Sequence, residues 1–206
     1  MNLPHIYLAS RSPRRRQILE MVGIKFTLLD IEVDEDDHIA DGPSNYVITL
    51  SGKKAEEASS RINEGIVATA DTIVYLDGQV LNKPKDVEDA RRMLGLLSGR
   101  THQVYTGFTL LRVPGHEIVQ DYGVTDVTFR RLDQDEINEY AESGVALDKA
   151  GAYGIQDDLS ALFVERIDGD FYNVVGLPLS KFYLALKNFS RSNLPGSSVD
   201  AEKTSR

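Results

Sequence analysis

The sequence of 206 residues contains no cysteine, and its 32 acidic residues outnumber its 23 basic residues. Without cysteine, disulfide bonds and thiolate metal sites are excluded. No run is long and apolar enough to predict a transmembrane helix, and the first residues lack a signal-peptide pattern. We therefore expect a soluble cytoplasmic protein with no membrane partner. The net charge of −9 also argues against a general surface for nucleic acids.

Positive charge is concentrated locally, in residues 11–16, directly after the apolar run Ile6–Ala9. This pattern predicts a strand, a polar loop and a helix that has Ser12 at its N-cap. A helix N-terminus attracts anions through its free N–H groups, and arginines there oppose the helix dipole. Arg14 and Arg15 therefore point to a bound anion, and phosphate suits the guanidinium group best. A solvated basic surface on an ordinary helix explains this loop, taken alone, equally well.

Further along the chain, strand and helix patterns alternate. Strands are predicted at residues 6–9, 26–31, 66–76 (interrupted at 70–72), 79–81, 102–112, 118–131, 162–167 and 172–175, and helices at 13–22, 44–60 (capped by Ser44), 87–98, 134–143 and 180–189. Tight turns at 77–78 and 168–169 predict hairpins. Hairpins mixed with strand–helix units indicate an α/β fold with a mixed twisted sheet and flanking helices. Residues 190–206 are polar and aperiodic, which predicts a disordered tail.

Four charged residues are candidates for chemistry. Asp71 lies in a run of small and β-branched residues, where a buried carboxylate needs a cation, a metal or several N–H donors; the alternative is an aspartate that caps a turn or bulge. Glu35 belongs to an acidic loop and Lys54 to a helix, and both are solvent-facing on their own evidence. Lys83 is held extended by Pro84, which gives a point charge a defined position.

Together with the arginines, these residues form a set suited to phosphate. Cations stabilise the charge on phosphate oxygens, a metal bridges them, and a carboxylate orients or deprotonates water. Magnesium is expected as the divalent metal because the ligands are hard oxygens, with manganese or cobalt as alternatives. The sequence has no Gly-rich loop followed by Lys-Ser/Thr and no G-x-G-x-x-G after a strand, which disfavours P-loop and dinucleotide-binding enzymes.

Eight motifs, taken in order, resemble the Maf family of nucleotide pyrophosphatases. They are Ser-x-Ser-Pro-Arg-Arg at 10–15, Asp-Glu at 34–35, Lys-Ala at 54–55, Ala-Asp-Thr-Ile-Val at 70–74, Lys-Pro at 83–84, Leu-Ser-Gly-Arg-Thr-His at 97–102, Asp-Lys-Ala-Gly-Ala-Tyr-Gly-Ile-Gln at 148–156 and Asn-Val-Val-Gly-Leu-Pro at 173–178. The resemblance implies one domain over residues 1–189, an inosine triphosphatase-like architecture, and two lobes around a central cleft. It also suggests a homodimer and a link to septum formation.

The resemblance further implies hydrolysis of a nucleoside triphosphate to the monophosphate and pyrophosphate. The Tyr-Gly-Ile-Gln ending is similar to the branch that acts on dTTP and UTP, and modified pyrimidine triphosphates are included in this expectation. Because an amide offers a donor and an acceptor, Gln156 can bind the edge of uracil or thymine. The alternatives are a 7-methyl-GTP pyrophosphatase and a nucleotide-binding regulator of division without turnover.

Roles carry over position by position from the family. Asp71 matches the proton acceptor, and Glu35 and Asp71 are the expected metal ligands, although the sequence leaves open which acid is the base. Residues tied to substrate choice match Arg14, Thr72 and Gln156. The positions expected to line the phosphate and metal site match Ser10, Arg15, Glu35, Lys54 and Lys83. One departure from the family is the acidic pair at 157–158, where glycines are common.

Overall fold

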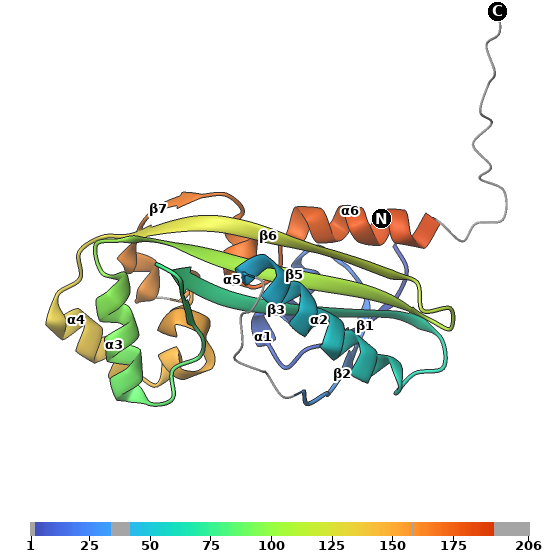
Figure 1. Cartoon of the computed structure of the whole chain (residues 1–206), viewed down its shortest axis with the longest axis horizontal. Coiled ribbons are helices and arrows are strands. Elements are labelled where there is room, and N and C mark those ends of the chain that lie inside the picture. The colour runs from blue at the N-terminus through green and yellow to red at the C-terminus, as the bar shows by residue number, and fades with distance from the viewer. Residues whose placement is uncertain (1–2, 34–41, 158, 192–206) are drawn as a thin grey trace, which may run out of the picture.

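The computed structural model describes residues 3–33, 42–157 and 159–191 (Figure 1). Its strands are β1 (Ile6–Ala9), β2 (Phe26–Leu29), β3 (Gly65–Leu76), β4 (Gln79–Leu81), β5 (Thr101–Val113), β6 (Ile118–Phe129) and β7 (Val164–Asp168). The α-helices are α1 (Pro13–Met21), α2 (Pro43–Ser59), α3 (Val87–Leu97), α4 (Gln134–Glu142), α5 (Phe171–Val175) and α6 (Leu179–Arg191). Three short 3-10 helices lie between α4 and β7: η1 (Val145–Asp148), η2 (Ala150–Ala152) and η3 (Ser160–Phe163). None of these helices is both long and apolar enough to cross a lipid bilayer.

The strands form one mixed sheet, which confirms the predicted α/β class. Their order is β2-β1-β3-β5-β6-β7, and β4 pairs with β3 outside this path. β1 is parallel to β2 and to β3, whereas the other pairs are antiparallel. The long strands β3, β5 and β6 run from one end of the molecule to the other (Figure 1). They therefore provide one continuous frame for helices packed at both ends.

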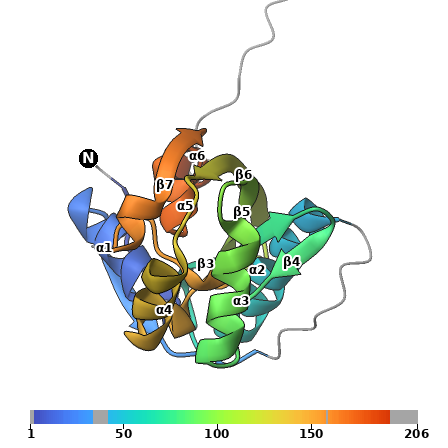
Figure 2. The same cartoon turned by 90° about the vertical axis from the view of Figure 1, so that its left-hand side faces the viewer.

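Helices cover both faces of this sheet. Leu19 of α1 packs with Ala68 of β3, and α6 covers the same face. Ala55 of α2 packs with Val67 of β3, whose side chain points to the opposite face because side chains alternate along a strand. Figure 2 shows α1 and α2 on opposite sides of the sheet, with α3 and α4 nearest the viewer. Helices α3 and α4 pack against each other at one end of the long strands.

Most predicted elements are confirmed, and their caps explain where the helices begin. The Asp86 side chain accepts a hydrogen bond from the backbone N–H of Asp89 at 2.8 Å and caps α3. Asp133 begins α4 in a capping box with Glu136. Ser12 is at the N-cap of α1, but its side chain makes no capping hydrogen bond.

Four local predictions are wrong. The hairpin predicted around 168–169 does not form, because β7 pairs with β6 and is followed by a helix. Residues 172–175 lie in helix α5, not in a strand, because the Asp170 side chain accepts a hydrogen bond from the N–H of Tyr172 at 2.8 Å and begins a helix just after β7. Ser44 does not cap α2, which begins at Pro43 after Gly42. The predicted interruption at 70–72 is also absent, since β3 pairs continuously with β5 through these residues. The Asp71 carboxylate pairs with a cationic side chain, so it does not interrupt β3.

His102 is a buried residue near the start of β5. It is 1% exposed, its Nε2 lies 2.8 Å from the hydroxyl of Tyr153, and its Nδ1 has no hydrogen-bond partner among the described residues. The ring also packs edge-on against Phe129. Burial lowers the pKa of His102 to about 3. The folded protein therefore keeps this imidazole neutral.

We expect this histidine to make stability depend on pH. Between the folded pKa of about 3 and an unfolded value of about 6.5, the unfolded chain binds a proton that the folded chain does not. The free energy of unfolding that the neutral histidine contributes is fully present above the unfolded pKa. It is lost as pH falls, by about 2 kcal/mol near pH 5. Urea unfolding at several pH values should show a steeper acid loss for the wild type than for His102→Gln. Equal slopes would refute this assignment.

Candidate active site

The candidate site lies at a gap along one edge of β3. Within the described residues, β1 pairs with this edge as far as Ala68, and β4 joins it only from Val74. The opposite edge of β3 is paired with β5 throughout. The stretch between the two partners contains Asp71 and Thr72. In sheets with parallel strands, ligands commonly bind beyond the carboxyl ends of strands, where neighbouring connections diverge.

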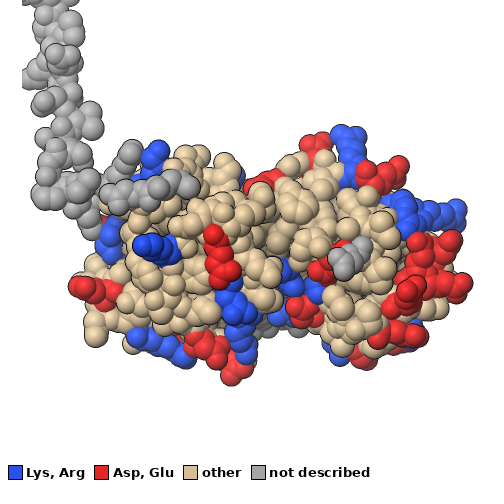
Figure 3. Space-filling model, turned by 180° about the vertical axis from the view of Figure 1, so that it is seen from behind, with Lys and Arg blue, Asp and Glu red and all other residues tan. Residues whose placement is uncertain are grey.

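A cleft of about 560 Å³ opens at this gap. Every predicted site residue that the structure describes lines it: Ser10, Arg14, Arg15, Lys54, Asp71, Thr72, Lys83 and Gln156. The lining combines α1 and α2 from one end of the molecule with the segment after η1 from the other. Seen from behind, basic and acidic side chains meet at the waist between these ends (Figure 3). The predicted arrangement of two parts around a cleft agrees with this geometry.

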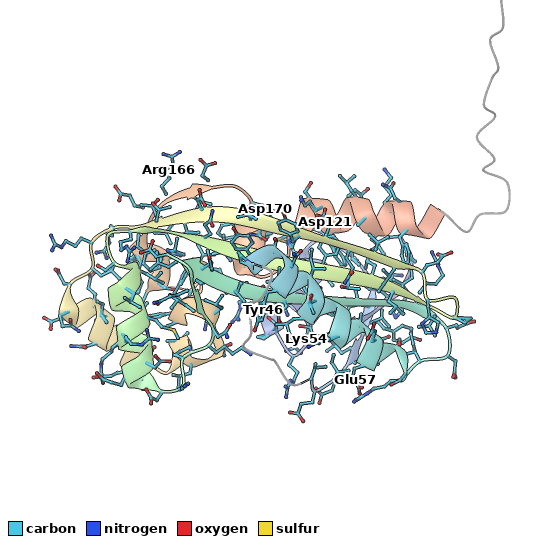
Figure 4. All side chains as sticks on the ribbon, viewed as in Figure 1. Tyr46, Lys54, Glu57, Asp121, Arg166 and Asp170 are labelled. Carbon is cyan, nitrogen blue, oxygen red and sulfur yellow. The ribbon has the colours of Figure 1, made fainter. Side chains whose placement is uncertain are left out.

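Asp71 and Lys54 form a short ion pair in the cleft. Lys54 projects from α2 (Figure 4), and its Nζ lies 2.5 Å from Oδ1 of Asp71. The two side chains are only 15% and 10% exposed. The carboxylate is thus held in place by a cation from the neighbouring layer. This partner is one of the three kinds predicted for a buried aspartate, whereas the solvent-facing interpretation of Lys54 is wrong.

Arg15 joins three segments that are distant in the sequence. Its Nε donates to the carbonyl oxygen of Gly176 at 2.8 Å, and its Nη2 donates to Oγ1 of Thr72 at 3.0 Å. Its Nη1 lies 3.4 Å from Oγ of Ser10. Thr72 continues the chain of contacts to Thr106 at 2.9 Å. Arg15 therefore fixes the N-terminal end of α1 against β3 and the loop before α6, with its charge at the cleft.

Arg14 spans the cleft in the other direction. Its Nη1 donates to Oδ2 of Asp148 at 3.0 Å, and its Nη2 donates to the Asp148 carbonyl oxygen at 3.3 Å. Burial alone raises the pKa of Asp148, but the hydrogen bond from Lys149 and the charges of Arg14 and Lys149 give a net lowering. Asp148 therefore stays ionised and ties α1 to η1.

Lys83 and Gln156 are exposed residues that face the same cleft. Lys83 lies in the loop between β4 and α3, and its ammonium group has no carboxylate partner in the part of the chain that the structure describes. Gln156 follows the buried Ile155. Both polar groups are therefore placed to contact a ligand rather than to stabilise the fold.

Lys149 is a cleft residue to which the sequence analysis assigned no role. It is 5% exposed and its Nζ contacts Asp148 at 2.7 Å, Asp157 at 3.2 Å and the carbonyl oxygen of Val145. Its position after an aspartate and before a run of small residues was the available signal. Asp157 also accepts a hydrogen bond from the hydroxyl of Tyr140 at 3.2 Å. The negative charge of Asp157 is therefore compensated, and Asp158 lies outside the described residues.

Of the two predicted metal ligands, the structure describes Asp71. Glu35 lies outside the described residues, and within those residues no group of three or more His, Cys, Asp or Glu side chains could hold a metal ion. Asp71 supplies one carboxylate at the cleft. Magnesium often binds through one or two carboxylates together with substrate phosphates and water. The described donor therefore fits a magnesium ion that binds together with a phosphate ligand.

Comparison with known proteins places this geometry in a family. Residues 5–189 match the family model described as Maf-like protein. The chain belongs to the Maf family. A relative from Clostridium perfringens, named dTTP/UTP pyrophosphatase, is 48% identical over 186 residues, covering 89% of this chain and 96% of the relative. A relative of the same name from Caldanaerobacter subterraneus is 45% identical over 188 residues, covering 91% and 90%.

A third relative, from Clostridioides difficile, has the same name and is 43% identical over 190 residues, covering 92% of this chain and 97% of the relative. Among solved structures, a nucleoside-triphosphatase / dITP/XTP pyrophosphatase from Mycobacterium abscessus covers 93% of this chain and 100% of its own at 14% identity, with a TM-score of 0.43. A likeness at this level carries no argument about the reaction.

Proposed function

We propose that this Maf-family protein hydrolyses dTTP and UTP to the nucleoside monophosphate and pyrophosphate. The observation that carries the proposal is one cleft that holds the Asp71–Lys54 pair beside two arginines at the start of α1. The relatives named dTTP/UTP pyrophosphatase support the same substrates. Binding of a triphosphate alone does not call for a carboxylate among the phosphates, because like charges repel. The carboxylate therefore favours hydrolysis over simple binding.

In this reaction, one group of cleft residues acts on the attacking water molecule and the other group binds the phosphates. Asp71 orients a water molecule and takes its proton as the oxygen attacks the α-phosphorus. The bond from the α-phosphorus to the bridging oxygen breaks, and pyrophosphate leaves with that oxygen. Lys54 keeps the Asp71 carboxylate in place. The cations that stabilise the charge on the phosphate oxygens are Arg14, Arg15 and Lys83.

A divalent metal, with magnesium as the first choice, completes the proposed site. Asp71, which the structure describes, would be one ligand, and Glu35 would be the second, as the family resemblance implies. When bound, the metal neutralises charge on the phosphate oxygens and aligns them for attack. Arg14 and Lys83 remain necessary because a triphosphate carries more negative charge than one divalent ion offsets. Manganese and cobalt are alternatives that satisfy the same hard donors.

Gln156 recognises the base of the nucleotide. Uracil and thymine present an N3–H donor between two carbonyl acceptors, whereas cytosine presents an acceptor at N3. An amide side chain can match either edge, depending on which of its ends faces the base. Thr72 and Arg14 lie in the same cleft and set the position of the nucleotide relative to Gln156.

Release of pyrophosphate from a panel of nucleotides tests this function. With magnesium present, dTTP and UTP should be converted to monophosphate and pyrophosphate faster than CTP, ATP, GTP or 7-methyl-GTP. Chelation by EDTA should stop the release, and added magnesium should restore it. A magnesium-dependent rise in melting temperature with a bound monophosphate would report the metal independently of turnover. Inorganic phosphate as the first product, or preference for 7-methyl-GTP, would contradict the proposal.

A further inference from the structure

Gln156 and Asp157 are adjacent in sequence but differ in their surroundings. Gln156 is exposed and lines the cleft, whereas the Asp157 side chain is 20% exposed and contacts groups behind the cleft surface. Oδ2 of Asp157 lies 3.2 Å from Nζ of Lys149. The same oxygen accepts a hydrogen bond from the hydroxyl of Tyr140, also at 3.2 Å. Burial raises the pKa of Tyr140 to about 12, so this hydroxyl remains a donor. One oxygen of Asp157 is thus fixed by two donors.

The second oxygen of Asp157 faces the side chain of Gln156. Nε2 of Gln156 lies 3.4 Å from Oδ1 of Asp157 and donates to it. An ionised carboxylate can only accept hydrogen bonds. The opposite amide orientation would bring the carbonyl oxygen of Gln156 against a negatively charged oxygen. The NH₂ end of Gln156 is therefore held by Asp157, and the carbonyl oxygen is on the side of the amide away from it.

We infer that Asp157 is a specificity-determining positioning residue, which orients the Gln156 amide so that it offers an acceptor to the base. An acceptor matches the N3–H of uracil and thymine and opposes the N3 lone pair of cytosine. This inference rests on the proposed function, because it assumes that Gln156 meets the base. It adds a physical reason for discrimination between two pyrimidines of nearly equal size.

The surrounding structure keeps Asp157 in this place. A Cβ atom on Gly154 would lie 2.5 Å from Oδ2 of Asp157 and 2.8 Å from Cε of Lys149, so only glycine permits this packing. The N–H of Asp157 also donates to the carbonyl oxygen of Gly154 at 2.9 Å. Lys149 is itself held by Asp148. The network therefore fixes the Asp157 carboxylate, and the orientation of Gln156 depends on its one hydrogen bond to that carboxylate.

The substitution Asp157→Asn tests the inference with almost no change in shape. The ammonium group of Lys149 should keep the amide oxygen of the new side chain in the place of Oδ2. Its NH₂ group then takes the place of Oδ1 and donates toward residue 156. Gln156 should turn over to accept that hydrogen bond and present its own NH₂ to the base. The variant should therefore lose preference for uracil and gain activity on cytosine nucleotides.

The measurement is the ratio of kcat/KM for UTP to kcat/KM for CTP, with the binding of both nucleotides followed by calorimetry. We expect Asp157→Asn to lower the ratio by about tenfold or more, the effect of one exchanged hydrogen bond. Asp157→Ala, which frees the amide to rotate, should give an intermediate ratio. The exposed Asp135→Asn on α4 is the matched control and should keep the wild-type ratio. In a Gln156→Met background, Asp157→Asn should change the ratio no further.

An unchanged ratio in folded Asp157→Asn and Asp157→Ala, checked by melting temperature, overturns the inference and leaves the proposed function intact. A wild type that binds UTP better than CTP but hydrolyses neither overturns the proposed function, and the binding ratio of the variants then tests Asp157 alone. A wild type with no preference between the two nucleotides in turnover or binding overturns the inference as well.

Discussion

Asp71→Asn should reduce the rate of pyrophosphate release by about 10²–10⁴-fold, the usual contribution of a general base. The substitution keeps the shape of the side chain and one oxygen for Lys54, which lies 2.5 Å from the wild-type carboxylate. It removes the group that takes the proton from water. Because Arg14, Arg15 and Lys83 remain in the cleft, the affinity for a monophosphate product should change much less than kcat.

The matched control for this variant is Asp77→Asn. Asp77 lies in the turn that follows the same strand, is exposed, and has a φ of 48°, a conformation that asparagine also tolerates. Its variant should keep the wild-type rate. Turnover by Asp71→Asn within tenfold of the wild type, with an unchanged melting temperature, would exclude Asp71 as the base. Loss of nucleotide binding together with turnover would instead make it a binding residue.

Local patterns point to Asp71, Lys83 and the two arginines because each pattern carries a physical demand. The family resemblance, and no local pattern, points to Ser10, Lys54, Thr72 and Gln156. A carboxylate within a small, β-branched run needs a partner, and Asp71 has one in Lys54. Arginines at a helix N-terminus oppose the dipole, and Arg15 lies at the cleft beside β3. The Asp86 cap is a local feature as well, because its hydrogen bond reaches only to Asp89, three residues further on.

The remainder depends on contacts between distant parts of the chain. Arg15 donates to Gly176, which lies 161 residues away, and no local pattern encodes that pair. Residues 171–175 are so short that apolar spacing does not separate strand from helix, and the Asp170 cap decides. The Lys149–Asp157 pair likewise depends on how the segment after η1 folds back on itself. Such contacts become visible only in three dimensions.

Gly107→Ala should destabilise the protein strongly, because α2 contacts the sheet at this glycine. Gly107 lies on β5, opposite Asp71 in the sheet register. A Cβ atom there would lie 2.6 Å from both the carbonyl carbon and the carbonyl oxygen of Val47, and 2.9 Å from the backbone nitrogen of Ile48. These are backbone atoms of a helix, which cannot rotate away as a side chain can. Either α2 or β5 must therefore move as a rigid unit to relieve these contacts.

We expect the free energy of unfolding to fall by about 3 kcal/mol or more, at the upper end for an overpacked core. Gly95→Ala on α3 is the control, since a Cβ atom there has no neighbour within 4 Å. It should stabilise the helix by about 0.5–1 kcal/mol. Urea unfolding measures both.

The same displacement should also disturb the Lys54–Asp71 ion pair. Lys54 lies on α2, which packs against Gly107, and Asp71 lies on β3, opposite Gly107 in the sheet. Folded Gly107→Ala should therefore lose kcat as well as stability, whereas Gly95→Ala should lose neither. If Gly107→Ala unfolds like the wild type, α2 has room to move away from β5 at little cost. If it is destabilised but keeps the wild-type kcat, the Lys54–Asp71 pair does not depend on how closely α2 approaches the sheet.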